Sequence, residues 1–534
     1  MDSGRIRQGP LTRAAVVLLT GGALLLALAL AGCGTAGATS KSQRSARGQG
    51  HGHAASGASG GARRAAATAG TIGVTGATVA PAIPAGFVGL SIEAKALEQF
   101  AGSNPRAIDP AFVHLLQDIA PQPSPVLRIA GDSTDWSWWP VPHAARPPGV
   151  KYDLTPTWMS VAHSLAADLH ARLILGVNLE ADSRAVATAE AGAMLSRIGR
   201  SYLDAFELGN EPELYGSFGW YRSPVTHLLV PGRPPTYSIA NFIGDFARFS
   251  SYLRGDPIAG PSMGGPKWLE SLDSFVAAEH RLSVVTVHAY PLKHCTKSTV
   301  VTSAQLLADS SSHGLAQRVA PWVALSSRHH RPLRVDEMNG ISCGGTRGVS
   351  DTFTSALWVL DTLFEMARTG VSGVNIHTVP NTINEVVGPA SANGGGAMRV
   401  HPEFYGMVMF AQAAPAGSHL LRLSGSSPSG VKVWATRAGD GSTHVVVINK
   451  RLGGAAMVQV KIPGAHGAAS VEQLQASGVH ATSGVTLGGQ TFGAATSTGL
   501  LGGKPAGLTV SPAGDTYPVR VPAASATMLS LPAG

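Results

Sequence analysis

Glu211 and Glu337 each end a short run of β-forming residues. At the first, an apolar run stops at Asn210, Glu211 and Pro212, so a strand would end by presenting an amide and a carboxyl together. Two facing carboxyl groups can cleave a glycosidic bond, because one protonates the leaving oxygen while the other attacks the sugar or activates water. The two glutamates therefore indicate chemistry on a glycoside.

The elements that must position these glutamates repeat along the chain from residue 87 onward, where β-rich runs alternate with helical patterns. The strand candidates are 87–92, 126–130, 172–178, 205–209, 258–263, 284–290, 333–337 and 373–378, and the helix candidates are 110–119, 157–169, 184–198, 239–253, 268–278, 303–326, 352–369 and 403–411. This alternation predicts an α/β fold, a (β/α)8 TIM barrel over 85–416, whose chemistry lies at the carboxyl ends of the strands. A doubly wound sheet is the alternative, although it rarely runs to eight regular repeats.

A second domain is predicted after the barrel, over 417–534, where short alternating strands are separated by glycine-rich turns. The candidates 431–436, 444–449, 456–462 and 526–531 are typical of a β-sandwich. A β-like stretch within 72–84 precedes the barrel and could add a strand to this domain. The sandwich would then be discontinuous in sequence.

The formal net charge of +8 is concentrated at the N-terminus, where residues 1–75 hold eight Lys or Arg against a single acid, Asp2. The remainder of the chain is nearly neutral. The charge therefore gives no support for nucleic-acid binding, and we expect no such partner.

The first 33 residues read as an export signal, with arginines, then the apolar run 14–31, then Leu-Ala-Gly-Cys ending at Cys33. That ending resembles the lipobox of bacterial lipoproteins, in which the cysteine becomes the lipidated first residue. An ordinary signal peptide or an uncleaved anchor is the alternative. Residues 34–71 contain almost no large apolar side chain and are expected to be a flexible tether. We expect an exported protein, lipid-anchored on the outer side of the membrane or secreted.

Two further cysteines, Cys295 and Cys343, each lie a few residues beyond a predicted strand end. An isolated pair in an oxidising compartment is a disulfide candidate. Two free or buried thiols are the alternative.

Polar side chains also follow the ends of the other predicted strands. They are Glu93, Arg128, Asp132, Asp135, Asn178, His288, Tyr290, Asn339, Asn375 and His377. Each alone could be a loop hydrogen-bonding group, but together they would lie on one face of one barrel, which predicts a site there.

These motifs resemble a known family. Gly-Asn-Glu-Pro at 209–212, His-Ala-Tyr at 288–290 and Glu337 resemble the clan of retaining glycosidases with catalytic carboxylates on strands four and seven. Within it, the segments 127–131, 337–345 and 402–406 are similar to glycoside hydrolase family 79, which includes β-glucuronidases and heparanases. The resemblance covers roughly residues 72–534.

By position, the resemblance implies that Glu211 is the general acid/base and Glu337 the nucleophile. Glu211 must carry a proton when the bond breaks, which a negative Glu337 nearby favours. Asn210 would hydrogen-bond the 2-hydroxyl of the sugar. Tyr290 would donate its phenol proton to Glu337, and Arg128 would help to keep that carboxylate anionic.

The resemblance also implies residues that hold the sugar. Glu93 and Asp132 match positions that bind sugar hydroxyls. His288 and His377 would line the subsite, and Asn178 would support it.

In the family, a tyrosine and backbone N–H groups in the loop after the nucleophile hold a uronate carboxylate. Here that loop is 340–345, with Ser342 where tyrosine is expected. Gly344 and its neighbours could still present N–H groups to a carboxylate.

A different chemistry is suggested by 260–264, Gly-Pro-Ser-Met-Gly, which matches the nucleophile elbow of serine hydrolases. Asp336 and His377 could complete its triad. This interpretation leaves the Asn-Glu-Pro motif and Glu337 unexplained.

The sequence thus predicts a retaining β-glycosidase, with β-glucuronidase-type activity favoured over β-glucosidase-type or transglycosylase activity on the same fold. A non-catalytic carbohydrate-binding lipoprotein is the alternative from another class. We expect a monomer that needs no metal or organic cofactor, because the carboxylates supply the chemistry.

Overall fold

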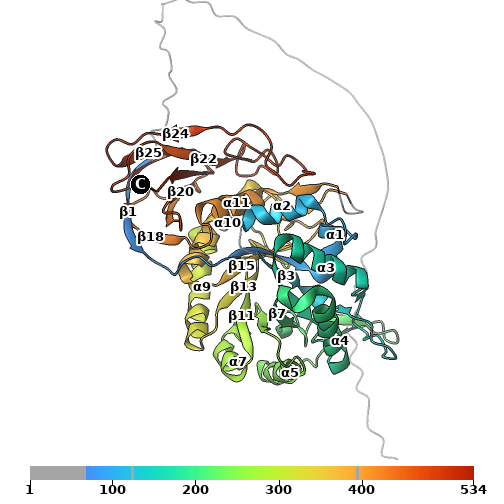
Figure 1. Ribbon diagram of the computed structural model, residues 1–534. Helices are drawn as coiled ribbons and strands as arrows, with labels where there is room; N and C mark the ends of the chain where they lie inside the picture. The colour runs from blue at the N-terminus through green and yellow to red at the C-terminus, as the bar shows by residue number, and fades with distance from the viewer. Residues whose placement is uncertain (1–67, 122–124, 392–395, 534) are drawn as a thin grey trace, which may run out of the picture. The chain divides into compact units, whose positions relative to one another are not determined.

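Eight parallel strands close into a barrel in the computed structural model, which describes residues 68–121, 125–391 and 396–533 (Figure 1). In chain order they are β2 (Val88–Glu93), β3 (Val126–Ala130), β6 (Arg172–Val177), β7 (Leu203–Leu208), β10 (Ile258–Met263), β11 (Leu282–Ala289), β13 (Leu333–Met338) and β15 (Gly373–Thr378). The ring closes where β15 pairs in parallel with β2. These strands are apolar runs because helices cover their outer faces. The predicted (β/α)8 barrel is confirmed.

Helices surround the barrel (Figure 1). They are α1 (Leu97–Ala101), α2 (Pro110–Ile119), α3 (Pro156–Leu169), α4 (Arg184–Met194), α5 (Ile239–Tyr252), α6 (Pro266–Leu269), α7 (Leu272–Ala278), α8 (Ser303–Leu307), α9 (Asp309–Arg328), α10 (Phe353–Thr369) and α11 (Pro402–Ala413). Local signals start several of them: Asp109 accepts hydrogen bonds from the first turn of α2, and Thr155 does so for α3, each followed by proline.

Three predicted helices differ from the observed ones. The stretch 303–326 breaks because Ala308 adopts extended backbone between α8 and α9. The stretch 268–278 divides into α6 and α7, and 184–198 ends as a π-helical turn, Leu195–Gly199. Apolar spacing continues through such breaks, so periodicity alone does not reveal them.

The β-rich domain is built on one hydrogen-bonded path of strands, in the order β23-β22-β26-β20-β19-β18-β1-β21-β25, with β24 paired to β22. The strands are β1 (Thr68–Thr78), β18 (His419–Ser426), β19 (Val431–Arg437), β20 (Thr443–Asn449), β21 (Ala456–Lys461), β22 (Ala469–Gln475), β23 (Thr486–Leu487), β24 (Leu508–Val510), β25 (Thr516–Val521) and β26 (Ser525–Leu531). They enclose one apolar core that includes Ile72, Val445, Val458, Tyr517 and Leu529.

The N-terminal strand β1 joins this domain, antiparallel to β18 and parallel to β21. It begins at Thr68, whereas the tether was predicted to continue to residue 71. Ala69 and Gly70 are poor strand formers, and they are strand here because they pair with Met457 and Val458 of β21.

In the described parts of the chain, four short two-stranded sheets lie in the loops around the barrel. They are β4 (Ser137–Trp138) with β5 (Tyr152–Asp153), β8 (Gly219–Arg222) with β9 (Leu229–Pro231), β12 (Leu292–Lys293) with β14 (Ile341–Ser342), and β16 (Val387–Pro389) with β17 (Met398–Val400). Among the described residues, no helix is both long and apolar enough to span a bilayer.

A buried ion pair joins the barrel to the β-rich domain. Lys450, after β20, donates to Asp361 on α10 at 2.5 Å and to Ser312 on α9 at 3.0 Å. Trp434 of β19 also donates to Asp361, at 2.8 Å, and its ring stacks on Phe364. Burial alone would raise the pKa of Asp361, but the ammonium groups of Lys450 and Lys432 hold it below its ordinary value. The carboxylate of Asp361, buried where the two domains meet, is therefore paired with a cation and hydrogen-bonded.

We expect Lys450→Met to lower the free energy of unfolding by about 3 kcal/mol, because it leaves the carboxylate of Asp361 buried without its cation. Lys461→Met is the matched control: its ammonium is 3.7 Å from Asp515 and its side chain is 55% exposed, so about 1 kcal/mol or less should be lost. Urea unfolding of the two variants measures both values. Equal losses would contradict a stabilising role for the buried pair.

Candidate active site

Arg128 lies at the centre of the site, on β3, with no exposed surface. Its Nη1 donates to Glu337 at 2.7 Å, its Nε to Glu207 at 2.7 Å, and its Nη2 to the side-chain oxygen of Asn210 at 2.8 Å. Ser91 and Ser262 accept further bonds, at 3.0 and 3.1 Å. A planar guanidinium can hold several acceptors at once in fixed directions. It thereby fixes residues from four other strands, β2, β7, β10 and β13, or from the residues just after them, around one point.

The two predicted catalytic glutamates face each other there. Glu211 follows β7 in the left-handed region, with φ of 45°, and its N–H donates to the carbonyl of Ser262. Glu337 lies on β13. One oxygen of Glu211, one of Glu337 and one ring nitrogen of His288 all lie within 4.8 Å of one another. This separation suits a retaining double displacement, for which the carboxyl groups are about 5 Å apart.

Glu337 is held as a carboxylate. Burial by itself would raise its pKa, but the nearby His377, His288 and Arg128 lower it, and so does the hydroxyl of Tyr290, which donates to Oε1 at 2.9 Å. The net effect places the pKa of Glu337 far below its ordinary value. A carboxylate in this state is a competent nucleophile.

His288 bridges the two glutamates. Its Nδ1 is 3.0 Å from Glu211 and 3.9 Å from Glu337. Burial lowers the pKa of His288, but the charge of Glu337 and the hydrogen bond to Glu211 outweigh burial and raise it to about 10. His288 is therefore an imidazolium at neutral pH, which is a larger role than lining the subsite.

Behind these residues lie two more carboxyl groups, Glu207 on β7 and Asp336 on β13, both without exposed surface. Burial, with Coulombic repulsion from Glu207, raises the pKa of Asp336 well above its ordinary value, whereas Arg128 lowers that of Glu207 despite burial. Of the two carboxyl groups, Asp336 is therefore the one whose raised pKa favours the protonated form. The centre holds two cations, Arg128 and His288, against two firm anions, Glu207 and Glu337.

Asp135 holds the end of β7 in place. Its Oδ2 accepts from the N–H of Asn210 at 2.9 Å and from the hydroxyl of Tyr215 at 2.7 Å. Gly209 has φ of 75°, and a Cβ there would lie 2.2 Å from the Tyr215 hydroxyl. Position 209 therefore requires glycine, which explains the first residue of the Gly-Asn-Glu-Pro motif.

The predicted sugar-binding residues surround the pair. Glu93 accepts from the N–H groups of Asp132 and Ser133, at 3.2 and 2.8 Å. The carboxylate of Asp132 accepts from the amide of Asn210 at 3.0 Å. His377 lies 3.8 Å from Glu93 and 3.9 Å from Glu337. The three side chains therefore form one group that adjoins Asn210 and Glu337.

Asn178 has a different position. Its amide donates to the carbonyls of Asp135 and Ser137, at 3.0 and 2.8 Å, and its oxygen accepts from Ala181. Its side chain therefore supports the loop that carries Asp135 rather than bonding to either catalytic glutamate.

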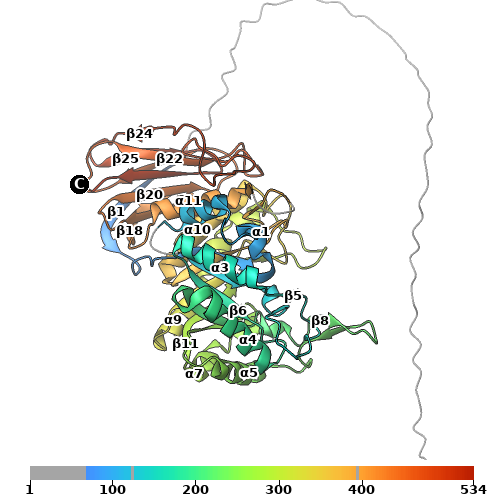
Figure 2. The ribbon, with the colours of Figure 1, turned by 45° about the vertical axis from the view of Figure 1, so that its right-hand side comes forward.

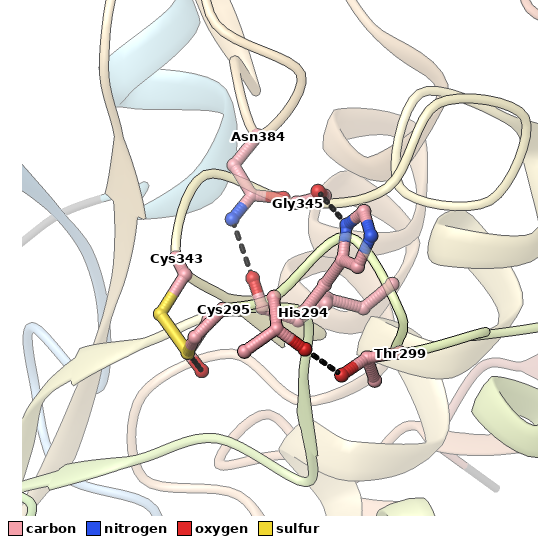
Figure 3. Close-up of a disulfide and its surroundings, with 9 residues drawn as sticks. His294, Cys295, Thr299, Cys343, Gly345 and Asn384 are labelled. Carbon is pink, nitrogen blue, oxygen red and sulfur yellow. Dashed lines mark hydrogen bonds between the residues drawn. A yellow bond between two sulfur atoms is a disulfide. The ribbon is translucent and has the colours of Figure 1, made fainter. Parts of the chain in front are cut away.

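The loop after Glu337 is fixed to the loop after β11 (Figure 3). A disulfide joins Cys295 to Cys343, as predicted, and β12 pairs with β14, with Lys293 opposite Ser342. Asn384 donates to the carbonyl of Ile341 at 2.7 Å. Ser342 is half-buried and Gly344 is exposed, with φ of 85°.

The serine-hydrolase alternative does not assemble. Ser262 has φ of 55°, as an elbow serine would, and its Oγ lies 3.1 Å from His288. It also accepts from Arg128 and has no exposed surface. The partners of His377 are Ser91 and the carboxylates of Glu93 and Glu337, so the triad with Asp336 and His377 is wrong.

Sequence reasoning missed Glu207, Tyr215, Ser91 and the contact between His288 and Ser262. One signal was present: a charged residue at 207 interrupts a run that is otherwise apolar and predicted to be buried. Such a residue needs an internal partner of opposite charge.

Comparison with known proteins adds to this geometry. Residues 433–528 match the Glycosyl hydrolase family 79 C-terminal beta domain. The C-terminal domain is a family 79 domain. The family 79 resemblance inferred from the sequence is confirmed in this domain. No curated protein matches the chain.

Solved structures share the whole fold. A 4-O-α-L-rhamnosyl-β-D-glucuronidase from Fusarium oxysporum 12S has a TM-score of 0.67 and 21% identity, covering 86% of this chain and 100% of its own. CelM2, a bifunctional glucanase-xylanase from a metagenome library, has a TM-score of 0.59 and 14% identity, covering 87% and 99%. The GH51 arabinofuranosidase from Xanthomonas axonopodis pv. citri has a TM-score of 0.58 and 15% identity, covering 87% and 99%. At these identities the likeness concerns the barrel and the β-rich domain following it.

Tyr290→Phe should move the acidic limb of the pH profile of kcat/KM to higher pH, by about one unit. The lost hydrogen bond stabilises the charged form of Glu337, so its loss raises the pKa of Glu337, and the nucleophile then ionises only at higher pH. Tyr237→Phe is the control, since its hydroxyl donates to Asp245, at 2.9 Å, rather than to a catalytic glutamate. An unchanged acidic limb in Tyr290→Phe would show that this bond does not set the charge of Glu337.

Proposed function

We propose that this protein is a retaining β-glycosidase that acts by double displacement, with Glu337 as nucleophile and Glu211 as acid/base. The observation that carries the proposal is the close approach of the two carboxyl groups at the carboxyl ends of β7 and β13. One oxygen of Glu211 lies within 4.8 Å of one oxygen of Glu337. An inverting enzyme needs roughly 6.5 Å or more, so that a water fits between its carboxyl groups.

In the first step, the carboxylate of Glu337 attacks the anomeric carbon and forms a glycosyl ester. The bond from that carbon to the leaving oxygen breaks, and the oxygen takes a proton from Glu211. The amide of Asn210 is oriented by Arg128, which binds its oxygen, so its N–H points toward Asp132 and the sugar side of the site. There it would bond the 2-hydroxyl.

In the second step, Glu211 acts as base on a water that attacks the same carbon, which releases Glu337 and restores the anomeric configuration. His288 stays positive beside both glutamates and balances the charge that moves between them. A sugar acceptor in place of water would give transglycosylation by the same steps.

A glucuronide is the favoured substrate. Support comes from the family 79 domain and from the β-D-glucuronidase named among the similar structures. The loop with Ser342 and Gly344 offers left-handed glycine backbone, and its N–H groups could hold a carboxylate. A β-glucosidase-type exo-enzyme is the alternative on the same residues, and a carbohydrate-binding lipoprotein without turnover is the other.

The protein would act outside the cytoplasm, held by a lipid on Cys33 or released. The basic and apolar run before Cys33 supports this placement, as does the disulfide, which belongs to an oxidising compartment. Cys33, the signal segment and most of the tether lie outside the described residues.

Glu337→Gln should lower turnover by more than a thousandfold, because covalent catalysis needs an anionic oxygen there. The fold and sugar binding should persist. Hydrolysis of p-nitrophenyl glycosides by the full chain measures this, with Glu403→Gln as control, since Glu403 is a buried carboxyl on α11 outside the pair. Activity within tenfold of the unaltered chain would remove Glu337 from the mechanism.

A panel of p-nitrophenyl β-glucuronide, glucoside, galactoside and xyloside tests the substrate, and proton NMR tests the stereochemistry. We expect the glucuronide to be cleaved fastest and the β-anomer to appear first. Faster cleavage of the glucoside would leave the roles of the two glutamates unchanged but would contradict the preference for a uronate. An α-anomer as first product would contradict the retaining mechanism.

A further inference from the structure

Large apolar side chains are exposed on the segment that follows Glu211. Leu214 is 38% exposed, Phe218 65%, Val225 85%, Leu228 68% and Leu229 60%. Half of the exposed large hydrophobic residues in the described part of the chain belong to this one segment, residues 214–229. Figure 2 shows its strand β8 extending outward from the barrel beside β5. Exposed large apolar side chains that gather on one segment point to a binding surface.

The start of this segment is fixed to the catalytic residues through a single residue, Asp135. Asp135 accepts from Asn210, just before Glu211, and its carbonyl accepts from the indole of Trp220 at 2.8 Å. Leu214 and Phe218 lie between these two anchors. The chain from 210 to 220 is therefore a loop closed on Asp135, and neither exposed side chain can move far from Glu211.

Hydrogen bonds within the loop continue this link. The N–H of Leu214 donates to the carbonyl of Glu211 at 2.9 Å, and the N–H of Phe218 to the carbonyl of Leu214 at 2.7 Å. Leu229 extends the surface, because it lies across the backbone of Gly219, where a Cβ would come within 2.6 Å of it. The apolar surface thus begins one turn from the acid/base and continues onto β9.

Two polar side chains of the same loop, Tyr215 and Trp220, are buried, and Ser217 is bonded within the loop. The hydroxyl of Tyr215 bonds Asp135, that of Ser217 bonds the carbonyl of Leu214, and the indole N–H of Trp220 bonds Asp135. Few of its polar groups are left for the hydroxyls of a second sugar. Trp220, which could have stacked on a sugar ring, is only 6% exposed.

We propose that residues 214–229 form an apolar plus-subsite surface, and that the natural substrate is a glycoside of an apolar aglycone, such as an alkyl chain or a fused ring system, rather than an internal glycan linkage. The inference rests on the proposed function, because the acid/base is the residue that meets the leaving oxygen. Leu214 and Phe218 lie beside that residue, so they meet the group attached to that oxygen.

The test compares methyl and n-octyl β-glycosides of the sugar preferred in the panel, below the micelle concentration of the octyl compound. Both leaving groups are simple alcohols of similar basicity, so they differ only in contact. We expect kcat/KM for the octyl glycoside to exceed that for the methyl by about tenfold or more. Leu214→Ser/Phe218→Ser should reduce this ratio about tenfold, mainly through KM.

Leu452→Ser is the matched control, because Leu452 is 59% exposed on the β-rich domain and should leave both rates unchanged. A wild-type ratio near one, or a ratio that the double substitution leaves unchanged, overturns the inference. So does a double substitution that keeps the ratio but abolishes co-sedimentation with phosphatidylglycerol vesicles, since the surface would then bind a bilayer.

Failure of the proposed function gives a different result. The chain would cleave neither glycoside, and a mechanism-based inhibitor would not label Glu337. Calorimetric binding of the two compounds to Glu337→Gln then still decides the inference: tighter binding of the octyl glycoside supports it, and equal affinities overturn it.

Discussion

One buried guanidinium determines the arrangement of the site. Arg128 lies in the barrel interior without exposed surface, and it contacts Glu337, Glu207 and Asn210. An unpaired cation there would be prohibitively costly, so Glu337 and Glu207 must remain ionised to balance it. That requirement keeps the nucleophile anionic. The raised pKa of Asp336 and the imidazolium of His288 complete the charge distribution around the two catalytic glutamates.

A second constraint is geometric and comes from Asp135. Its carboxylate and carbonyl bind groups from the ends of β6 and β7, from Tyr215 and from Trp220, and those elements carry the amide, the acid/base and the apolar surface. The three parts that would bind sugar, deliver a proton and receive the leaving group are therefore positioned by one residue of the β3 loop. Asp135 is a positioning residue that acts through its neighbours.

The sequence was sufficient to predict the barrel, all eight strands, the disulfide and the meeting of Glu211 with Glu337, because each depends on local signals at strand ends. It could not reveal the breaks at Ala308 and near Ser271, since apolar spacing continues across them. The roles of Glu207 and Asp336 depend on which side chains share the barrel interior, and only the closed structure determines this. The charge of His288 follows from Glu337 and Glu211 acting together across strands. The exposure of the apolar side chains on residues 214–229 likewise follows only from the folded structure.

The place of β1 has a consequence for biosynthesis. This first strand lies between β18 and β21, whose residues follow it by more than 340 positions, with Thr71 opposite both Ser426 and Gln459. During translation the strand emerges long before its neighbours exist, so its N–H and C=O edges stay unpaired while the barrel forms. The sheet closes only when nearly the entire polypeptide has been made. A chain shortened at its C-terminus would carry an open strand edge at its other end, which makes completeness of synthesis a condition for solubility.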